Sequence, residues 1–320
     1  MLKRRKIAVI GVGAVGKNTA YALCLRGLTD DLVLVDKKIE KVEAEAQDLR
    51  DAMTYCPHPV HVTTAGYGDL GDCDIIVNAV GDMGLMWKTL NRLDELNFNI
   101  AQVNDFIPRI MAGGFKGIFI NISNPCDIIT SQVAKLSGLP RGHVFGTGTG
   151  LDSSRLIALL SAKTGIAHRS IGGFMMGEHG ASIMVPWSQI TFYSKPLSEL
   201  EKSGDPRFQI DHAAFRKQAE GNAYMVLSGK HRTEYGICTT AARVVELVVH
   251  DQKAIMPASI GLEGQYGVDG VNAGVPCVIG AGGVEDIMEY DLPEDELMEF
   301  RRCCENIKKN MTLNDAVIRD

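Results

Sequence analysis

Residues 6–16 read KIAVIGVGAVG, an apolar run that passes directly into three glycines spaced as Gly-x-Gly-x-x-Gly. A buried strand followed by this spacing predicts a tight turn that opens a helix. Gly11 permits the turn, Gly13 lets the backbone approach a pyrophosphate, and Gly16 lets the helix pack closely on the strand. Ala14 and Val15 place uncapped N–H groups at the start of that helix. The stretch therefore predicts a dinucleotide site, the plainer alternative being a glycine-rich turn without a ligand.

An acidic residue stands at the expected distance from this turn. Asp36 ends the next apolar run, residues 32–35, and lies twenty residues after Gly16. Its carboxylate would accept hydrogen bonds from the ribose hydroxyls and repel a 2′-phosphate. The pattern favours NAD over NADP as cofactor, although the neighbouring Lys37 and Lys38 weaken that preference.

The rest of the first half alternates apolar runs with helical patterns, which predicts βαβ units and a parallel sheet. The expected strands are residues 7–10, 32–35, 75–80, 117–122 and 144–145, and a charged, alanine-rich helix spans 39–53. The second half predicts twisted strands at 183–193 and 254–268 and helices at 208–227, 237–249 and 293–310. The fold class is thus α/β, with an N-terminal Rossmann-type doubly wound parallel sheet (residues 1–147) and a C-terminal α+β substrate domain (148–320).

Composition narrows the partners and the compartment. The 320 residues are 45% hydrophobic with a formal net charge of −6, so neither nucleic acid nor an anionic membrane has an electrostatic attraction to the chain. Eight scattered cysteines without a CxxC pair indicate reduced thiols and a cytoplasmic protein. Basic residues 3–6 before an apolar run imitate a secretory signal, but no small-x-small cleavage site follows.

One group of potential metal ligands needs an explanation. Cys56, His58 and His61 lie close together in the sequence. Pro57 and Pro59 between them favour a plain loop, and the expected chemistry needs no metal. The sequence therefore predicts no metal site.

Several polar clusters along the chain resemble the motifs of the L-lactate and malate dehydrogenase family. They are Arg92 after a loop, Ser123-Asn124-Pro125, Asp152-Ser153-Ser154-Arg155, Gly177-Glu178-His179-Gly180 and Thr233. The resemblance covers nearly the whole chain and is nearest to the L-2-hydroxyisocaproate dehydrogenase branch. It implies an NAD-dependent L-2-hydroxy acid dehydrogenase that works as a homodimer or homotetramer.

The chemistry of a 2-oxo acid reduction gives a role to three of these residues: His179, Asp152 and Arg155. His179 is the expected proton donor, because imidazole titrates near neutral pH. Asp152 would orient it and stabilise its charged form, as in the family's Asp–His pair. Arg155, one turn from Asp152 on the same helix face, would grip the substrate carboxylate with two donors.

The remaining residues are expected to complete the pocket. Arg92 would polarise the reacting carbonyl, and Thr233 would line the pocket beside the substrate. Asn124 would hydrogen-bond near the substrate oxygen or nicotinamide, and a cis bond before Pro125 would aim it. Val80 and Gly81 join Asn124 in the expected cofactor site.

The loop of residues 81–92 is expected to close over the site and to set substrate preference. Malate-specific relatives usually carry an arginine in this loop and lactate-specific ones a glutamine, whereas this chain has Met83-Gly84-Leu85. An apolar stretch favours a roomy apolar side-chain pocket and disfavours a dicarboxylate. Arg232, beside Thr233, keeps a malate-like substrate open, although solvent or a salt bridge is its expected partner. A non-catalytic NAD-binding sensor is a further alternative.

Overall fold

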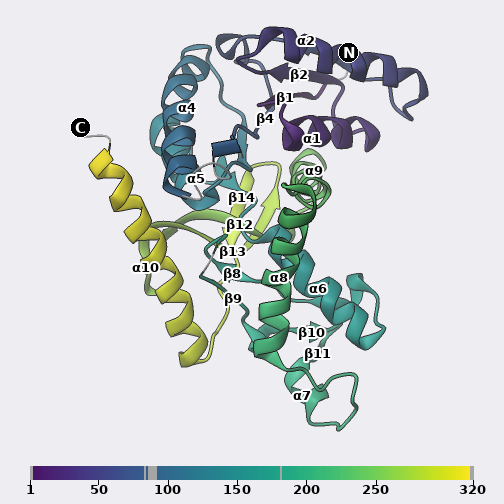
Figure 1. The fold of residues 1–320 in the computed structure, drawn as a ribbon, viewed down its shortest axis with the longest axis vertical. Coiled ribbons are helices and arrows are strands. Elements are labelled where there is room, and N and C mark those ends of the chain that lie inside the picture. Colours follow the sequence, from purple (N-terminus) through teal and green to yellow (C-terminus); the bar gives the residue numbers. More distant parts are fainter. Residues whose placement is uncertain (1–2, 83, 86–91, 181, 318–320) are drawn as a thin grey trace.

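The computed structural model describes residues 3–82, 84–85, 92–180 and 182–317 (Figure 1). The side chains of residues 92–94 and 312–317 lie outside this description. The predicted loop of residues 81–92 therefore falls largely outside the described part of the chain. The same holds for the side chain of Arg92, whose backbone begins a helix.

The first half forms a parallel sheet, as the sequence predicted. Its strands lie in the order β3-β2-β1-β4-β5-β6, so the strand order reverses between β1 and β4. Ligands of open α/β sheets bind at such a switch point, outside the carboxyl ends of the strands. The elements are β1 (Lys6–Ile10), α1 (Ala14–Leu25), β2 (Asp31–Val35), α2 (Ile39–Ala52), β3 (His61–Thr64), β4 (Ile75–Asn78), α4 (Arg92–Ala112), β5 (Ile118–Asn121), α5 (Cys126–Ser137) and β6 (Val144–Gly146).

The second half continues the same sheet with antiparallel strands. Ser259 of β12 pairs with Gly146 of β6, which joins the two halves edge to edge, and a separate three-stranded sheet has the order β11-β10-β7. The elements are α6 (Gly150–Thr164), β7 (Ile171–Gly172), β8 (Met176–Gly177), β9 (Ile183–Met184), β10 (Thr191–Phe192), β11 (Lys195–Pro196), α7 (Leu197–Glu201), α8 (His212–Lys230), α9 (Tyr235–Val249), β12 (Ala254–Glu263), β13 (Asp269–Gly280), β14 (Gly283–Ile287) and α10 (Glu294–Val317).

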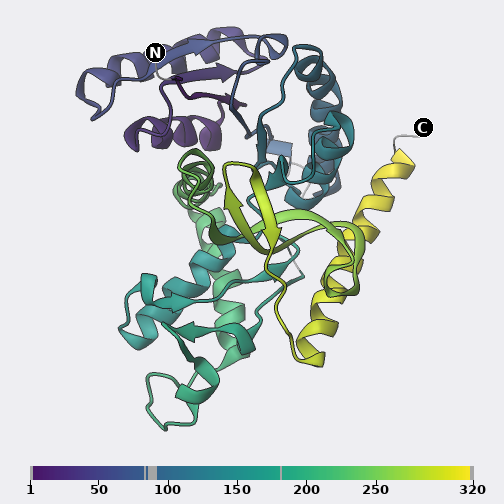
Figure 2. The ribbon, with the colours of Figure 1, turned by 180° about the vertical axis from the view of Figure 1, so that it is seen from behind.

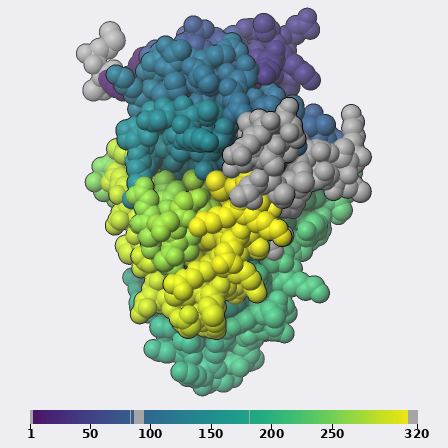
Figure 3. All heavy atoms as spheres, turned by 90° about the vertical axis from the view of Figure 1, so that its left-hand side faces the viewer, coloured from purple at the N-terminus to yellow at the C-terminus, as the bar shows by residue number. Residues whose placement is uncertain are grey.

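Helices pack on this sheet from both halves of the chain. In the first half α4 packs against α5, whereas α1 packs against α9 from the second half (Figures 1 and 2). The C-terminal helix α10 contacts β8, β9, β13 and α5. Figure 3 shows it on the molecular surface beside the lime-coloured residues that precede it. One hydrophobic core runs through both halves, and a smaller cluster lies under α6, α8 and the three-stranded sheet.

Several predicted boundaries were wrong for local reasons. The expected strand of residues 183–193 is broken, because a single 3-10 turn (Trp187–Gln189) follows Pro186 between β9 and β10. The expected helix of residues 208–227 begins at His212, where the side chain of Asp211 accepts a hydrogen bond from the Ala214 N–H. Strand β12 ends at Glu263, well before Val268. The sequence reading missed β3, an edge strand in which only Val62 is buried.

Candidate active site

The glycine-rich turn has the backbone that its sequence predicts. Gly11 adopts φ +84°, and its N–H donates to the Val35 carbonyl at 2.8 Å. A Cβ at Gly16 would lie 1.8 Å from the Gly11 carbonyl oxygen, so only glycine allows the helix to approach the turn this closely. A Cβ at Gly13, in contrast, would meet nothing within 4 Å. Packing therefore does not demand glycine at position 13, and the space beside it is open to a ligand.

Helix α1 points an uncapped N-terminus at this space. Gly13 is its N-cap residue and provides no side chain to satisfy the first N–H groups, which belong to Ala14 and Val15. Free N–H groups and the positive end of a helix dipole are the donors that a pyrophosphate needs. These residues thus fit the phosphate part of a dinucleotide.

Asp36 lies at the end of β2 with its carboxylate fixed in place. Its Oδ2 accepts a hydrogen bond from the Val12 N–H at 3.0 Å, and its Oδ1 accepts one from the Lys38 N–H at 3.0 Å. Lys37, in contrast, turns to helix α4, where its Nζ lies 3.1 Å from Asp105. The carboxylate is therefore held beside the glycine turn, where the sequence pattern expects a ribose contact.

The far side of the expected cofactor site lies at the ends of β4 and β5. The Val80 N–H donates to Oδ1 of Asn78 at 3.2 Å, and Gly81 is exposed. The peptide bond between Asn124 and Pro125 is cis, as predicted, and the exposed Asn124 accepts a hydrogen bond on its carbonyl from Asn99 at 2.6 Å. These residues follow neighbouring strands of the sheet, so they lie at its ligand-binding edge.

Three of the predicted site residues form one hydrogen-bonded cluster. Nδ1 of His179 lies 2.6 Å from Oδ2 of Asp152, and Nη1 of Arg155 donates to Oδ1 of the same carboxylate at 2.9 Å. Asp152 and Arg155 lie one turn apart on α6, whereas His179 follows β8. The carboxylate fixes Nδ1 as the protonated nitrogen, which leaves Nε2 for a substrate.

Burial and charge act in opposite directions on this cluster. Burial lowers the pKa of His179, but the carboxylate of Asp152 outweighs it, and the pKa lies above its ordinary value. Burial also raises the pKa of Asp152, and the His179 and Arg155 charges reverse that effect and hold it below its ordinary value. The pair therefore favours an ionised carboxylate beside an imidazolium, the state of a proton donor.

Thr233 and Arg232 lie in the turn between α8 and α9. Nε of Arg232 donates to Oε1 of Glu234 at 3.0 Å, and the side chain is 55% exposed. The salt bridge expected for Arg232 is thus present. No hydrogen bond or ion pair described for this part of the chain joins Thr233 to the His179 cluster, so its place beside a substrate stays a prediction.

Sequence reasoning missed two buried residues under the cluster. Oδ2 of Asp127, in the first turn of α5, accepts a hydrogen bond from the His179 backbone N–H at 3.0 Å. Its Oδ1 accepts a hydrogen bond from the Ser259 hydroxyl at 2.5 Å. The only sequence signal was an aspartate two residues after Pro125, in a run of apolar residues that otherwise predicts core.

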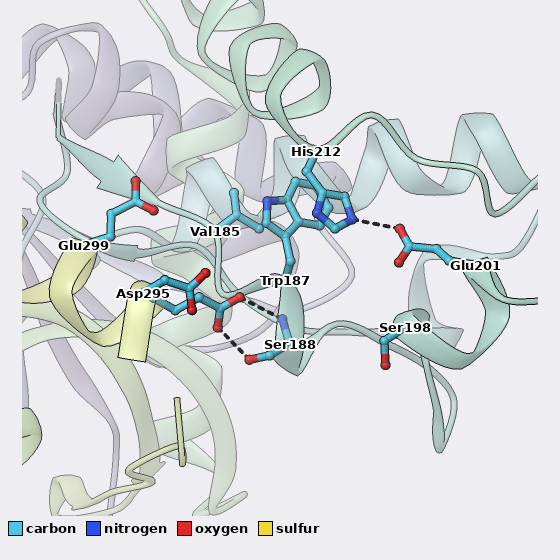
Figure 4. Close-up of a pocket in the computed structure, with 9 residues that line it drawn as sticks. Val185, Trp187, Ser188, Ser198, Glu201, His212, Asp295 and Glu299 are labelled. Atoms are coloured by element: carbon cyan, nitrogen blue, oxygen red, sulfur yellow. Dashed lines mark hydrogen bonds and ion pairs between the residues drawn. The ribbon is translucent and has the colours of Figure 1, made fainter. Parts of the chain in front are cut away.

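A pocket in the C-terminal half contains none of the predicted site residues (Figure 4). Trp187 stacks on His212 with ring centroids 4.2 Å apart, and Nε2 of His212 lies 2.7 Å from Glu201. Its wall also carries three carboxylates: Asp295, Glu296 and Glu299. A pocket rich in carboxylates repels a 2-oxo acid, so it does not compete as the substrate site.

All eight cysteines are free thiols, and no described helix is both long and apolar enough to cross a membrane. Among the described residues no group of three or more His, Cys, Asp or Glu side chains is arranged to hold a metal ion.

Comparison with known proteins matches both halves of the chain. The family profile described as lactate/malate dehydrogenase, NAD binding domain, matches residues 5–146, and its alpha/beta C-terminal domain matches residues 149–317. An L-lactate dehydrogenase of Fusobacterium nucleatum is 37% identical over 310 residues, covering 97% of this chain and 96% of the relative. L-lactate dehydrogenase 2 of Listeria monocytogenes is 38% identical over 312 residues, covering 97% and 99%.

Solved structures agree with these matches. The minor L-lactate dehydrogenase from Enterococcus mundtii, in its ligands-bound form, superposes with a TM-score of 0.92 at 31% identity and covers 97% of this chain and 98% of that one. MGS-M5, a lactate dehydrogenase from a Medee basin deep-sea metagenome library, gives 0.92 at 30% identity and covers 97% and 99%. This chain therefore belongs to the lactate/malate dehydrogenase family and is an NAD-dependent 2-hydroxy acid dehydrogenase.

Proposed function

We propose that the enzyme reduces a small 2-oxo monocarboxylic acid with an apolar side chain, and reverses that reaction, with His179 as proton donor. The observation that carries this proposal is the shared carboxylate of Asp152, which contacts both His179 and Arg155. One carboxylate thereby holds the proton donor and the anion-binding guanidinium side by side. A 2-oxo acid offers a carbonyl oxygen and a carboxylate on adjacent carbons, which is the matching arrangement.

Each residue of the cluster has a separate task. His179 holds a proton at Nε2 and delivers it to the substrate oxygen, and Asp152 stabilises the imidazolium until then. Arg155 binds the substrate carboxylate with donors that Asp152 does not use. NADH, when bound, supplies the hydride. The residues that fit it are Gly11, Gly13, Ala14, Val15, Gly16 and Asp36, together with Val80, Gly81 and Asn124.

Arg92, Asn124 and Thr233 keep their sequence-based assignments as part of the proposal. Arg92 begins α4, at the end of the loop expected to close on the substrate, and it would polarise the carbonyl as negative charge develops on oxygen. Asn124 lies at the carboxyl end of β5, next to the segment that supports His179. Thr233 lines the substrate side in a turn that α8 and α9 hold.

Two observations support a monocarboxylate as substrate. Gly84 and Leu85, two residues of the predicted loop that the structure describes, carry no charge that would pair with a second carboxylate. Arg232, the cation nearest to Thr233 in sequence, is already paired with Glu234. A branched 2-oxo acid of the kind used by the L-2-hydroxyisocaproate branch and pyruvate are both within this class.

A substrate panel tests the proposal. NADH oxidation is followed by absorbance with pyruvate, 2-oxoisocaproate, phenylpyruvate and oxaloacetate at equal concentrations. The expected result is a higher kcat/KM for an apolar monocarboxylate than for oxaloacetate. A preference for oxaloacetate that disappears in Arg232→Ala would instead establish malate dehydrogenase activity, the second candidate, which the presence of Arg232 beside Thr233 keeps open.

The proposal extends to domain limits, assembly and compartment. We place the domain boundary between Thr147 and Gly148, so that residues 1–147 form the dinucleotide-binding domain and residues 148–320 the catalytic domain. A homodimer or homotetramer is supported by exposed apolar side chains such as Tyr21 and Leu25, one turn apart on α1. Eight free thiols support the cytoplasm, and the net charge of −6 supports the absence of nucleic-acid and membrane partners. Light scattering of the purified protein measures the assembly.

A further inference from the structure

A second carboxylate, besides that of Asp152, contacts His179. Asp127 is 2% exposed and belongs to α5, in the N-terminal half of the chain. Its Oδ2 accepts the His179 backbone N–H at 3.0 Å, and its Oδ1 accepts the Ser259 hydroxyl at 2.5 Å. Burying a charged carboxylate costs free energy unless hydrogen bonds compensate it. The hydrogen bonds from His179 and Ser259 therefore depend on each other through Asp127.

Three separate segments meet at this carboxylate. Helix α5 supplies Asp127, strand β12 supplies Ser259, and the turn after β8 supplies the His179 N–H. His179 is therefore held twice: its ring by Asp152 on α6 and its backbone by Asp127 on α5. Without the second contact, the His179 backbone would lose the hydrogen bond that ties it to α5.

We propose that Asp127 is a positioning residue for His179, which fixes the backbone of the catalytic loop by its hydrogen bond and favours the imidazolium by its charge. This inference rests on the proposed role of His179 as proton donor. Asp127 acts through the histidine and not on substrate or cofactor. Its charge adds to that of Asp152, while Arg155 opposes both.

Titratable groups of α6, the His179 loop and α10 interact with the pair. Asp152 and Arg155 face His179 from α6, Glu178 is its neighbour in the loop, and Cys304 of α10 faces Asp127. Burial raises the pKa of Asp127 to about 6, while the Ser259 and His179 hydrogen bonds oppose that rise. The His179 N–H and the Ser259 hydroxyl both donate to this carboxylate, an arrangement that stabilises its charged form.

Two substitutions separate the hydrogen bond from the charge. In Asp127→Asn the amide oxygen still accepts from the His179 N–H, and the amide nitrogen can donate to the Ser259 oxygen, so the contacts stay and the charge is lost. Asp127→Ala removes both. Ser259→Ala is the matched control, because it removes a bond to the same carboxylate without touching His179.

The experiment measures kcat and KM for 2-oxo acid reduction against pH, and the imidazole titration of His179 by NMR in the enzyme without cofactor. His179→Asn identifies the resonance. Asp127→Ala is expected to lower kcat about 10-fold to 100-fold, since a small misplacement of a catalytic group has an effect of that size. Ser259→Ala is expected to lower it less. Asp127→Asn is expected to keep most of kcat and to move the His179 titration, and the alkaline limb of kcat/KM, to lower pH.

Two results would overturn the inference. They are a wild-type kcat in folded Asp127→Ala, and a His179 titration that Asp127→Asn leaves in place. If the alanine variant does not fold, the titration in the asparagine variant decides alone. The NMR measurement needs no turnover, so it tests the role of Asp127 even if the enzyme is inactive on every 2-oxo acid. Such inactivity would contradict the proposed function only.

Discussion

Nδ1 of His179 lies 2.6 Å from Oδ2 of Asp152, and the other oxygen of that carboxylate accepts a hydrogen bond from Arg155. The expected proton donor and the expected substrate anchor thus share one anion. A substitution of Asp152 affects both His179 and Arg155. A substitution of His179 or of Arg155 affects only the task of that residue. Mutant kinetics can therefore separate proton transfer from substrate binding.

Removing the charge of Asp152 should shift the pH profile of reduction. The pKa of His179 is raised by the Asp152 carboxylate against the opposing effect of burial. Reduction needs the protonated ring, so its rate is full below this raised pKa and is lost as pH rises through it. In Asp152→Asn the alkaline limb of kcat/KM should move to lower pH, and kcat should fall about 10²-fold to 10⁴-fold. Oxidation of the 2-hydroxy acid, which needs the neutral ring, should respond with the opposite pH dependence. An alkaline limb that stays in place would mean that another group controls it.

Replacing the proton donor should stop chemistry and spare cofactor binding. His179→Asn removes the titrating ring, and the glycine turn and Asp36 belong to a different part of the sheet. The expected loss in kcat is about 10²-fold or more, with the Kd for NADH, measured by fluorescence, within about threefold of the wild-type value. Turnover at the wild-type rate would reject His179 as the donor.

Arg155→Lys should weaken substrate binding more than it slows chemistry. A lysine keeps the charge but loses the planar pair of donors that binds a carboxylate with two hydrogen bonds. The expected result is a rise in KM for the 2-oxo acid of about 10-fold to 100-fold with a smaller change in kcat. Arg232→Lys is the matched control, because Arg232 is 55% exposed and paired with Glu234. Equal effects of the two substitutions would place the substrate carboxylate elsewhere.

The sequence predicted the parallel sheet and the cofactor turn well, because both depend on local rules. A strand buried on both faces must be apolar throughout, and Gly11 and Gly16 occupy positions where a side chain would collide with backbone. The pairing of Asp152 with His179 came from the family resemblance and from their chemistry. The distance between Asp152 and His179 along the sequence does not by itself predict that their side chains are in contact.

Asp127 and β3 could not be predicted, for different physical reasons. The role of Asp127 depends on Ser259 and on the His179 backbone, which lie 132 and 52 residues away. No local pattern reports contacts at that range. Strand β3 lies at the edge of the sheet and buries only Val62, so it lacks the apolar run by which the other strands were recognised.

Cofactor preference should depend on Asp36 together with Asp105. The Asp36 carboxylate is held by the Val12 and Lys38 N–H groups, and in the proposed cofactor site it would repel a 2′-phosphate. Asp36→Ser removes that repulsion. Lys37 nevertheless stays paired with Asp105 on α4. Arg109 pairs with the same carboxylate, from which its Nη1 lies 3.9 Å away.

The double variant Asp36→Ser/Asp105→Asn should therefore use NADPH better than Asp36→Ser alone, because it frees two cations for a phosphate. Since these ion pairs are exposed and individually weak, the added gain in kcat/KM is expected to be about 10-fold, and it should shrink as salt is raised. Asp105→Asn alone should change NADH use little, since Asp36, the proposed ribose contact, is unchanged. Steady-state kinetics with NADH and NADPH at two salt concentrations measure all three variants. A double variant no better than Asp36→Ser would show that Lys37 and Arg109 do not reach the 2′-phosphate.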